Sequence, residues 1–163
     1  MDHDAAGQPQ LTSRLYAIKQ MESAIRVLLD EALAPLDLRV RPYTALTVLA
    51  VKGDLSSAEL ARRAFMRAQS MQDVIRTLEA RGLVERRAAE RDRRVLLVAI
   101  TDAGREVVRQ GSVLTAPIEQ LLVTGTDPDA LAAFDAVVAH GRAALARAVQ
   151  QSRPIPNRSA PGR

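Results

Sequence analysis

Apolar residues recur at helical spacing along most of the chain, and their period changes in one stretch near the middle. Over 68–80, four apolar residues occupy positions i, i+3, i+4 and i+7, the spacing of one helix face. These residues are Met71, Val74, Ile75 and Leu78. Gly82 then suits the left-handed position beyond a helix end, and the residues of 83–87 and 95–100 are typical of strands. The pattern predicts a helix followed by a two-stranded hairpin.

A short helix is predicted immediately before this one. Ser56 and Glu59 form a capping-box pattern, in which the Ser56 hydroxyl accepts from the Glu59 amide and the Glu59 side chain reaches back. The helix then covers 57–63, and 64–67 has the length of the turn in a helix-turn-helix. Together with the charged hairpin, these elements predict a winged helix, whose second helix can enter a major groove while the hairpin reaches the backbone or minor groove.

Amphipathic helices are predicted on both sides of this core. Upstream, apolar residues at helical spacing predict a helix over 11–33, which Pro35 ends, and a second helix over 43–51. The first of these must bury its apolar face on something outside the small winged core. The alternative is that the flanking helices pack on one another within a single protomer.

The region after the hairpin predicts two further helices. Thr101 is the expected N-cap of the first, and Asp127 is the expected N-cap of the second. Gly111 and Pro117 lie inside the first helix, and a proline removes a hydrogen bond to the preceding turn. We therefore expect a kink or break near Val113.

The fold class expected from these patterns is mainly α with a small β-hairpin wing. The winged helix-turn-helix core is flanked by N- and C-terminal helices. The chain divides into a disordered lead-in (1–10), an N-terminal helix (11–35), the winged core (36–101), C-terminal helices (102–150) and a flexible tail rich in proline, serine and arginine (151–163).

Charge is concentrated in the predicted hairpin tip. The net charge is only +4, but five of the 21 arginines fall within 86–94. Such a run is usually a solvated face, yet behind a helix-turn-helix it favours contact with phosphates. Aromatic residues make up only 2% of the chain, which argues against a single-strand binder that stacks bases.

Several other classes of protein are excluded by composition. Cysteine is absent, which excludes disulfide scaffolds, thiolate zinc sites and cysteine-based redox sensing. No apolar stretch approaches the length of a membrane span, and the polar N-terminus is unlike a signal peptide, so we expect a cytoplasmic protein with no membrane partner. His3 and His140 stand alone, and no nucleophile elbow or glycine-rich loop is present, so no enzyme activity, metal or cofactor is expected.

The central stretch resembles the MarR family of transcriptional regulators. The resemblance rests on LSSAELARR at 55–63, on LEARGLV at 78–84, and on the hairpin pattern Asp92-x-Arg94 followed by Ile100-Thr101-x-x-Gly104. It covers roughly 11–150 and is strongest in the middle. It implies a homodimer joined through the terminal helices, which binds a palindromic duplex operator and is released, as a repressor, by a small aromatic or lipophilic effector.

Candidate DNA contacts follow from the helix face opposite the apolar stripe. Gln69 can bond the N6/N7 edge of adenine, and Asp73 can accept from cytosine N4. Ser57 and Gln72 are predicted to contact phosphates. The base-facing candidates are Gln69, Ser70, Asp73 and Arg76. The alternative is a merely polar, solvated face.

The resemblance assigns roles in the hairpin. It implies that Arg94 enters the minor groove and that Asp92 braces the wing by pairing with a nearby arginine. Arg93 shares the tip with Arg94, and Arg91 is predicted to contact phosphate. Family members often have a capping threonine or serine where this chain has Arg67, so Arg67 is a further candidate for phosphate contact.

The effector site implied by the resemblance lies between the terminal helices and the winged core. A cation beside a ring with an apolar wall suits an aromatic carboxylate, and the candidate residues are Arg14, Tyr16, Arg41 and Tyr43. Two other functions remain open: a winged-helix protein–protein adaptor, and an architectural DNA binder that senses nothing.

Overall fold

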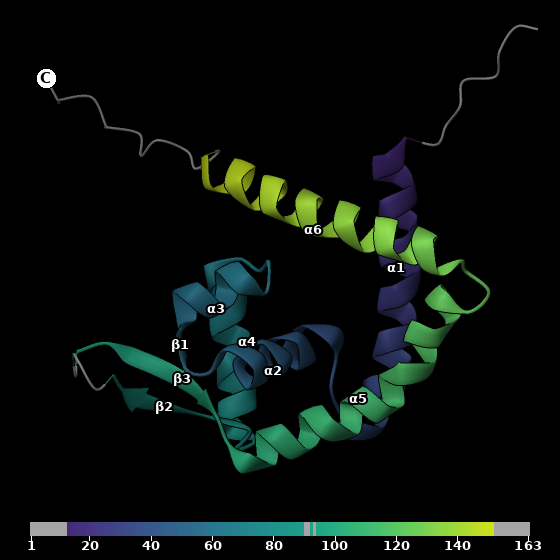
Figure 1. Ribbon diagram of the computed structural model, residues 1–163. Coiled ribbons are helices and arrows are strands. Elements are labelled where there is room, and N and C mark those ends of the chain that lie inside the picture. Colours follow the sequence, from purple (N-terminus) through teal and green to yellow (C-terminus); the bar gives the residue numbers. More distant parts are fainter. Residues whose placement is uncertain (1–12, 90–91, 93, 152–163) are drawn as a thin grey trace, which may run out of the picture. The chain divides into compact units, whose positions relative to one another are not determined.

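The computed structural model describes residues 13–89, 92 and 94–151, and Figure 1 shows the order of its elements. The predicted lead-in, Arg91, Arg93 and the tail from 152 onward lie outside these residues. The chain forms two units, 1–119 and 120–163. The elements are α1 (Arg14–Leu33), η1 (Ala34–Leu36), α2 (Val40–Lys52), β1 (Leu55–Ser56), α3 (Ser57–Arg63), α4 (Ala68–Ala80), β2 (Val84–Ala88), β3 (Leu96–Ile100), α5 (Asp102–Val123) and α6 (Pro128–Gln151).

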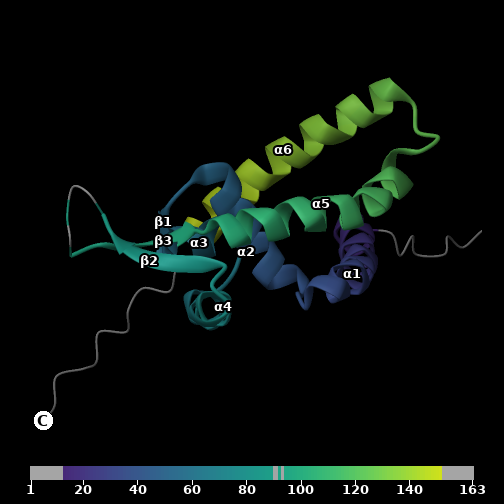
Figure 2. The ribbon, with the colours of Figure 1, turned by 90° about the horizontal axis from the view of Figure 1, so that it is seen from below.

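The first unit contains a three-stranded antiparallel sheet in the order β1-β3-β2. β2 and β3 form the predicted hairpin, with Val84 opposite Ile100 and Ala88 opposite Leu96. Figures 1 and 2 both show this hairpin projecting beyond α2, α3 and α4. β1 was not predicted, because two residues are too few to display a period of two; it pairs Leu55 with Val98.

One hydrophobic core joins α2, α3, α4 and the sheet. The stripe predicted on α4 is confirmed, since Met71, Ile75 and Leu78 are fully buried and Val74 is nearly so. The other core residues are Leu33, Leu38, Ala45, Leu46, Leu49, Leu60, Ala61, Ala64, Leu83, Val84, Val98 and Ile100. Burial of one face of α4 leaves its opposite, polar face to solvent.

The capping box of α3 is only half formed. The Ser56 hydroxyl accepts from the Glu59 amide at 3.2 Å, as predicted. The Glu59 carboxylate pairs instead with Arg63, at 2.6 Å, and with Arg62, so the prediction that it reaches back is wrong. Two guanidinium groups one turn along the same helix compete successfully for the carboxylate.

The predicted break near Val113 is absent, because α5 is one continuous helix with Pro117 inside it, and the alternative of a kink stays a prediction. Gly111 is buried, and a Cβ atom at this position would lie 2.2 Å from Cε2 of Tyr43. The Tyr43 hydroxyl donates to the carbonyl oxygen of Val108 at 3.4 Å. The glycine therefore serves close packing between α2 and α5 and does not end the helix.

The second unit consists of the end of α5 and α6. The side chain of Asp127 caps α6 as predicted, since its Oδ1 accepts from the amides of Asp129 and Ala130 at 2.9 and 3.2 Å. Over 13–89, 92 and 94–151, no helix has both the length and the apolar character needed to cross a membrane.

Replacing Phe65 with asparagine is expected to raise the melting temperature by a few degrees. Phe65 lies between α3 and α4 with a φ of 53°, and its side chain is 66% exposed. A bulky residue in this left-handed region costs about 1–2 kcal/mol, and asparagine tolerates it better. Thermal unfolding followed by circular dichroism tests the prediction, with Phe65→Leu as a control that keeps the strain. A lower melting temperature for Phe65→Asn would mean that ring packing outweighs the strain.

Candidate nucleic-acid interface

The outer face of α4 presents polar side chains away from the core. Gln69, Asp73 and Arg76 are exposed, and Ser70 is half-buried. The Asp73 carboxylate forms an ion pair with Arg76, one turn further along the helix. This partner offsets the repulsion that an isolated carboxylate would experience near phosphates. The sequence pattern did not reveal which cation would accompany Asp73.

Arg67 precedes α4 without capping it through its side chain. Its carbonyl oxygen accepts from the amide of Met71 at 3.0 Å, and no side-chain bond caps the helix. The Arg67 side chain is exposed. The Arg67 guanidinium is therefore available for contact with a phosphate at the start of α4. A serine or threonine at this position would instead cap the helix by accepting from its first backbone amides.

Ser57 and Gln72, both predicted as phosphate contacts, are bonded to each other. The Gln72 Nε2 donates to the Ser57 Oγ at 2.9 Å. Nη2 of Arg86 donates to Oε1 of Gln72 at 3.3 Å, and Nε of Arg86 lies 3.4 Å from Oε2 of Glu79. We call these four residues the Gln72 relay; it connects α3, α4 and β2. The sequence did not predict the contact between Arg86 and Glu79. It joins β2 to α4 across a turn, so its spacing matches neither the helical nor the strand period.

The hairpin tip is shaped by Asp92. Its Oδ1 accepts from the backbone amide of Arg94 at 3.0 Å, and its carbonyl oxygen accepts from the amide of Val95 at 2.9 Å. Asp92 thus stabilises a turn that presents Arg94, whose side chain is exposed. Pairing between Asp92 and an arginine side chain stays a prediction, and the predicted contacts Arg91 and Arg93 lie outside the described residues.

The base of the hairpin is bonded to the start of α5. The Thr101 hydroxyl donates to the carbonyl oxygen of Gly82 at 2.7 Å, and the Thr101 amide donates to that of Leu83 at 3.1 Å. The same hydroxyl accepts from the amide of Gly104 at 3.1 Å, which confirms Thr101 as an N-cap. These bonds hold the wing in a fixed relation to the end of α4.

Arg81 connects the end of α4 to the segment between α1 and α2. Its guanidinium donates to the carbonyl oxygens of Asp37 and Leu36 at 2.6 and 2.9 Å. The sequence carried no signal for this contact, because the partners are more than forty positions apart. The end of α4 is thereby attached to a segment that lines a pocket.

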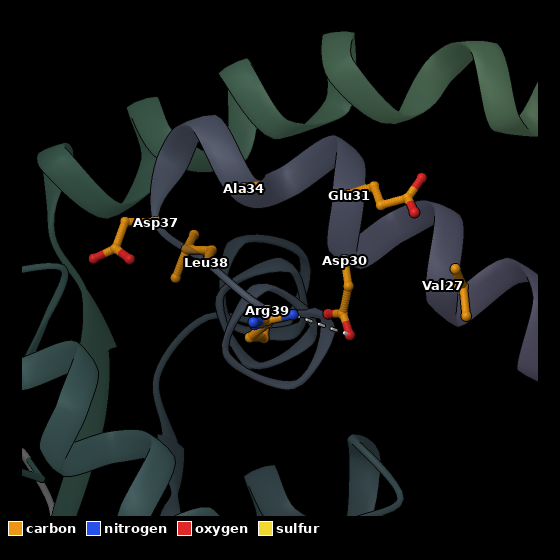
Figure 3. A pocket seen from close by; sticks show the side chains of 7 residues that line it. All are labelled: Val27, Asp30, Glu31, Ala34, Asp37, Leu38 and Arg39. Atoms are coloured by element: carbon orange, nitrogen blue, oxygen red, sulfur yellow. Dashed lines mark ion pairs between the residues drawn. The ribbon is translucent and has the colours of Figure 1, made fainter.

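That pocket has a volume of about 440 Å³ and lies between the second half of α1 and the segment before α2 (Figure 3). Asp30 accepts from the amide of Val40 at 2.8 Å and lies 4.0 Å from the Arg39 guanidinium. The lining residues are Val27, Asp30, Glu31, Ala34, Asp37, Leu38 and Arg39. The three lining carboxylates still outnumber the guanidinium groups of Arg39 and Arg81, the second of which lies 4.0 Å from the Asp37 carboxylate, and this balance disfavours a carboxylate ligand.

The four candidate effector residues do not line this pocket. Arg14 and Tyr16 are exposed in the first turn of α1, and Tyr16 lies about 25 Å along the helix axis from Leu33. Arg41 is exposed at the start of α2, and Tyr43 is half-buried against α5. Arg14 and Tyr16 therefore lie at the end of α1 that is remote from the segment leading to α2.

Two carboxyl groups outside the α4 face have lowered pKa values. Hydrogen bonds from Arg109 and then Gln110 lower the pKa of Glu106 to about 2, and a hydrogen bond from Lys19 lowers the pKa of Glu22. Both groups are exposed on helix surfaces and stay ionised near neutral pH. In the part of the chain that the structure describes, no three histidine or carboxylate side chains are arranged to hold a metal ion.

Comparison with known proteins places this arrangement in a family. The MarR family model matches residues 36–95. The HTH-type transcriptional repressor Rv2887 of Mycobacterium tuberculosis is 33% identical over 114 residues, which cover 69% of this chain and 82% of that protein. A protein of the same description from Mycobacterium bovis matches equally well.

Solved structures share the fold. CouR from Rhodococcus jostii RHA1, bound to p-coumaroyl-CoA, superposes with a TM-score of 0.71 at 21% identity, over 91% of this chain and 99% of that chain. A mutant MarR from E. coli, complexed with operator DNA, superposes with a TM-score of 0.69 at 22% identity, over 77% and 90%. The predictions of a winged helix and of a non-enzymatic regulator are confirmed. This chain belongs to the MarR family of DNA-binding transcriptional regulators.

Proposed function

We propose that the protein is a homodimeric, ligand-responsive repressor that binds a palindromic duplex operator in the cytoplasm. The observation that carries this proposal is the pairing of an exposed polar face on α4 with a projecting hairpin in the same unit. Such a unit can place a helix in the major groove and a hairpin on the adjacent backbone or minor groove.

In this proposal the α4 face reads bases and the surrounding residues contact the backbone. Gln69, Ser70, Asp73 and Arg76 face the major groove, and Arg94 enters the minor groove. Ser57, Arg67 and the arginines at 91 and 93 meet phosphates. Gln72 is not among the proposed phosphate contacts, because its amide nitrogen donates to Ser57 and its amide oxygen accepts from Arg86.

A second copy of the chain accounts for the apolar residues that α1 leaves in solvent. Leu15 is 76% exposed and Ile18 is 58% exposed, and Met21, Val27 and Leu28 on the same helix are also exposed. Monomeric proteins rarely leave so many large apolar side chains uncovered on one element. A two-fold dimer would also match the symmetry of a palindrome.

The pocket beside Arg81 is the proposed effector site. CouR binds p-coumaroyl-CoA, so a protein of this fold is known with an aromatic thioester bound. In this chain the lining of apolar and acidic side chains favours a neutral or cationic lipophilic molecule. Because Arg81 joins the pocket's Asp37 to the end of α4, an effector with different affinities for two arrangements of this segment would shift DNA binding.

Fluorescence anisotropy with duplex DNA from upstream of the protein's own gene tests the proposal. We expect binding that exceeds a scrambled duplex and weakens steeply with salt, with light scattering giving the mass of a dimer. Equal, weak binding to both duplexes would favour an architectural DNA binder. Absence of binding at low salt would overturn the regulator and favour a protein–protein adaptor.

A further inference from the structure

The centre of the Gln72 relay is an amide whose two ends are chemically different. Its oxygen only accepts hydrogen bonds and its nitrogen only donates them. Gln72 is half-buried on α4, between Ser57 at the first residue of α3 and Arg86 on β2. The orientation of this amide therefore decides what each neighbour can do with its own polar atoms.

Arg86 determines that orientation. A guanidinium has donors and no acceptor, so the Gln72 oxygen must face it, at 3.3 Å from Nη2. Glu79, 3.4 Å from Nε, holds the same guanidinium from the other side. The Gln72 nitrogen then faces Ser57 at 2.9 Å, and the serine oxygen is the acceptor. Over 13–89, 92 and 94–151, the Ser57 hydroxyl donates to no acceptor, so its hydrogen remains available.

We propose that Gln72 is a positioning residue, which holds the Ser57 hydroxyl as a donor toward a DNA phosphate and does not contact DNA itself. The inference rests on the proposed function. Phosphate oxygens accept hydrogen bonds and cannot donate them, so a serine whose hydrogen were used inside the protein would present only lone pairs to the backbone. Arg86 belongs to the hairpin. The Ser57 hydroxyl is therefore held as a donor toward the phosphate only when the hairpin packs against α4.

The test compares the effect of Ser57→Ala in two backgrounds. With Gln72 present, Ser57→Ala should weaken operator binding about tenfold for each hydrogen bond to phosphate that is lost. Gln72→Glu keeps the shape and the bond from Arg86, but its second oxygen accepts the Ser57 hydrogen. In that background Ser57→Ala should have almost no further effect. The Gln72→Glu protein and the Gln72→Glu/Ser57→Ala protein both carry the added negative charge. Its effect on affinity therefore cancels when the two are compared.

Ala80→Glu is the matched control, because it adds the same charge to an exposed position of the same helix that has no proposed contact with DNA. In this third background Ser57→Ala should again weaken binding about tenfold. An equal effect of Ser57→Ala in all three backgrounds would overturn the role of Gln72. Absence of any binding by the wild-type protein would instead contradict the proposed function itself. The failure of the proposed function and the failure of the role of Gln72 are therefore distinguishable.

A second variant keeps the test open if Gln72→Glu does not fold. Arg86→Met removes the donor that orients the amide, so Gln72 is free to turn and the effect of Ser57→Ala should shrink. The dependence of affinity on salt should stay unchanged, since Arg86 pairs with Glu79 and Gln72. A slope reduced by about 0.9 would identify Arg86 as a phosphate contact and would overturn this assignment.

Discussion

Replacing Gly104 with alanine is expected to reduce the free energy of unfolding by about 1–3 kcal/mol or more. The new Cβ atom would lie 2.2 Å from the carbonyl oxygen of Leu83 and 2.7 Å from Cγ1 of Ile100. The Leu83 oxygen belongs to the backbone and accepts from the amide of Thr101 at 3.1 Å. It cannot move away without breaking a bond that joins the hairpin to α5.

Urea denaturation measures this effect, and Ala103→Ser is the control. Ala103 is the exposed neighbour of Gly104 on the same helix, so its change to serine should cost only a few tenths of a kcal/mol. If the two substitutions destabilise the protein equally, the close approach at Gly104 is not what limits this position. Loss of the hairpin's attachment should also weaken operator binding by Gly104→Ala under conditions where the protein remains folded.

Replacing Arg94 with alanine is expected to weaken operator binding by roughly 5- to 150-fold, corresponding to about 1–3 kcal/mol. Arg94 is exposed at the hairpin tip, in a turn that Asp92 stabilises through the Arg94 amide. Each arginine that neutralises a phosphate releases counterions, so the slope of log affinity against log salt should fall by about 0.9 per contact. Anisotropy titrations at several salt concentrations provide both quantities.

Arg142→Ala is the matched control, because it removes the same charge from an exposed position on α6. It should leave affinity and slope nearly unchanged. Equal losses for both variants would mean that net charge, and not the hairpin tip, governs binding. Loss of affinity without any change of slope would indicate that Arg94 stabilises the hairpin and does not contact DNA.

Local patterns in the sequence were sufficient to predict α4 and the helix caps around the candidate interface. The spacing of Met71, Val74, Ile75 and Leu78 predicted α4 with its observed bounds and its buried face, and therefore also the exposed face. The caps at Ser56, Thr101 and Asp127 were predicted correctly for the same reason. In each case the interacting atoms lie within about one helical turn, so the covalent chain itself brings them together.

Contacts between distant residues were decided by the tertiary structure. The sequence suggested that Gly111 weakens the helix that contains it. In the structure Tyr43 of α2 packs so closely against this position that it leaves no room for a Cβ atom. Gln72 looked like an exposed contact until Ser57 and Arg86 occupied both ends of its amide. The short strand β1 and the pocket beside Arg81 had no local signal at all.

The amino-acid sequence by itself therefore determined the buried face of α4, where α3, α4, α5 and α6 begin and which family the hairpin resembles. It placed the start of α1 at 11 and of α2 at 43, whereas these helices begin at 14 and 40. The tertiary structure decided which polar side chains are already bonded and which remain available to DNA. The physical reason is the range of the interactions. Helix periodicity and capping depend on neighbours a few positions away, whereas the partners of Gln72, Arg81 and Gly111 meet only when separate elements pack together.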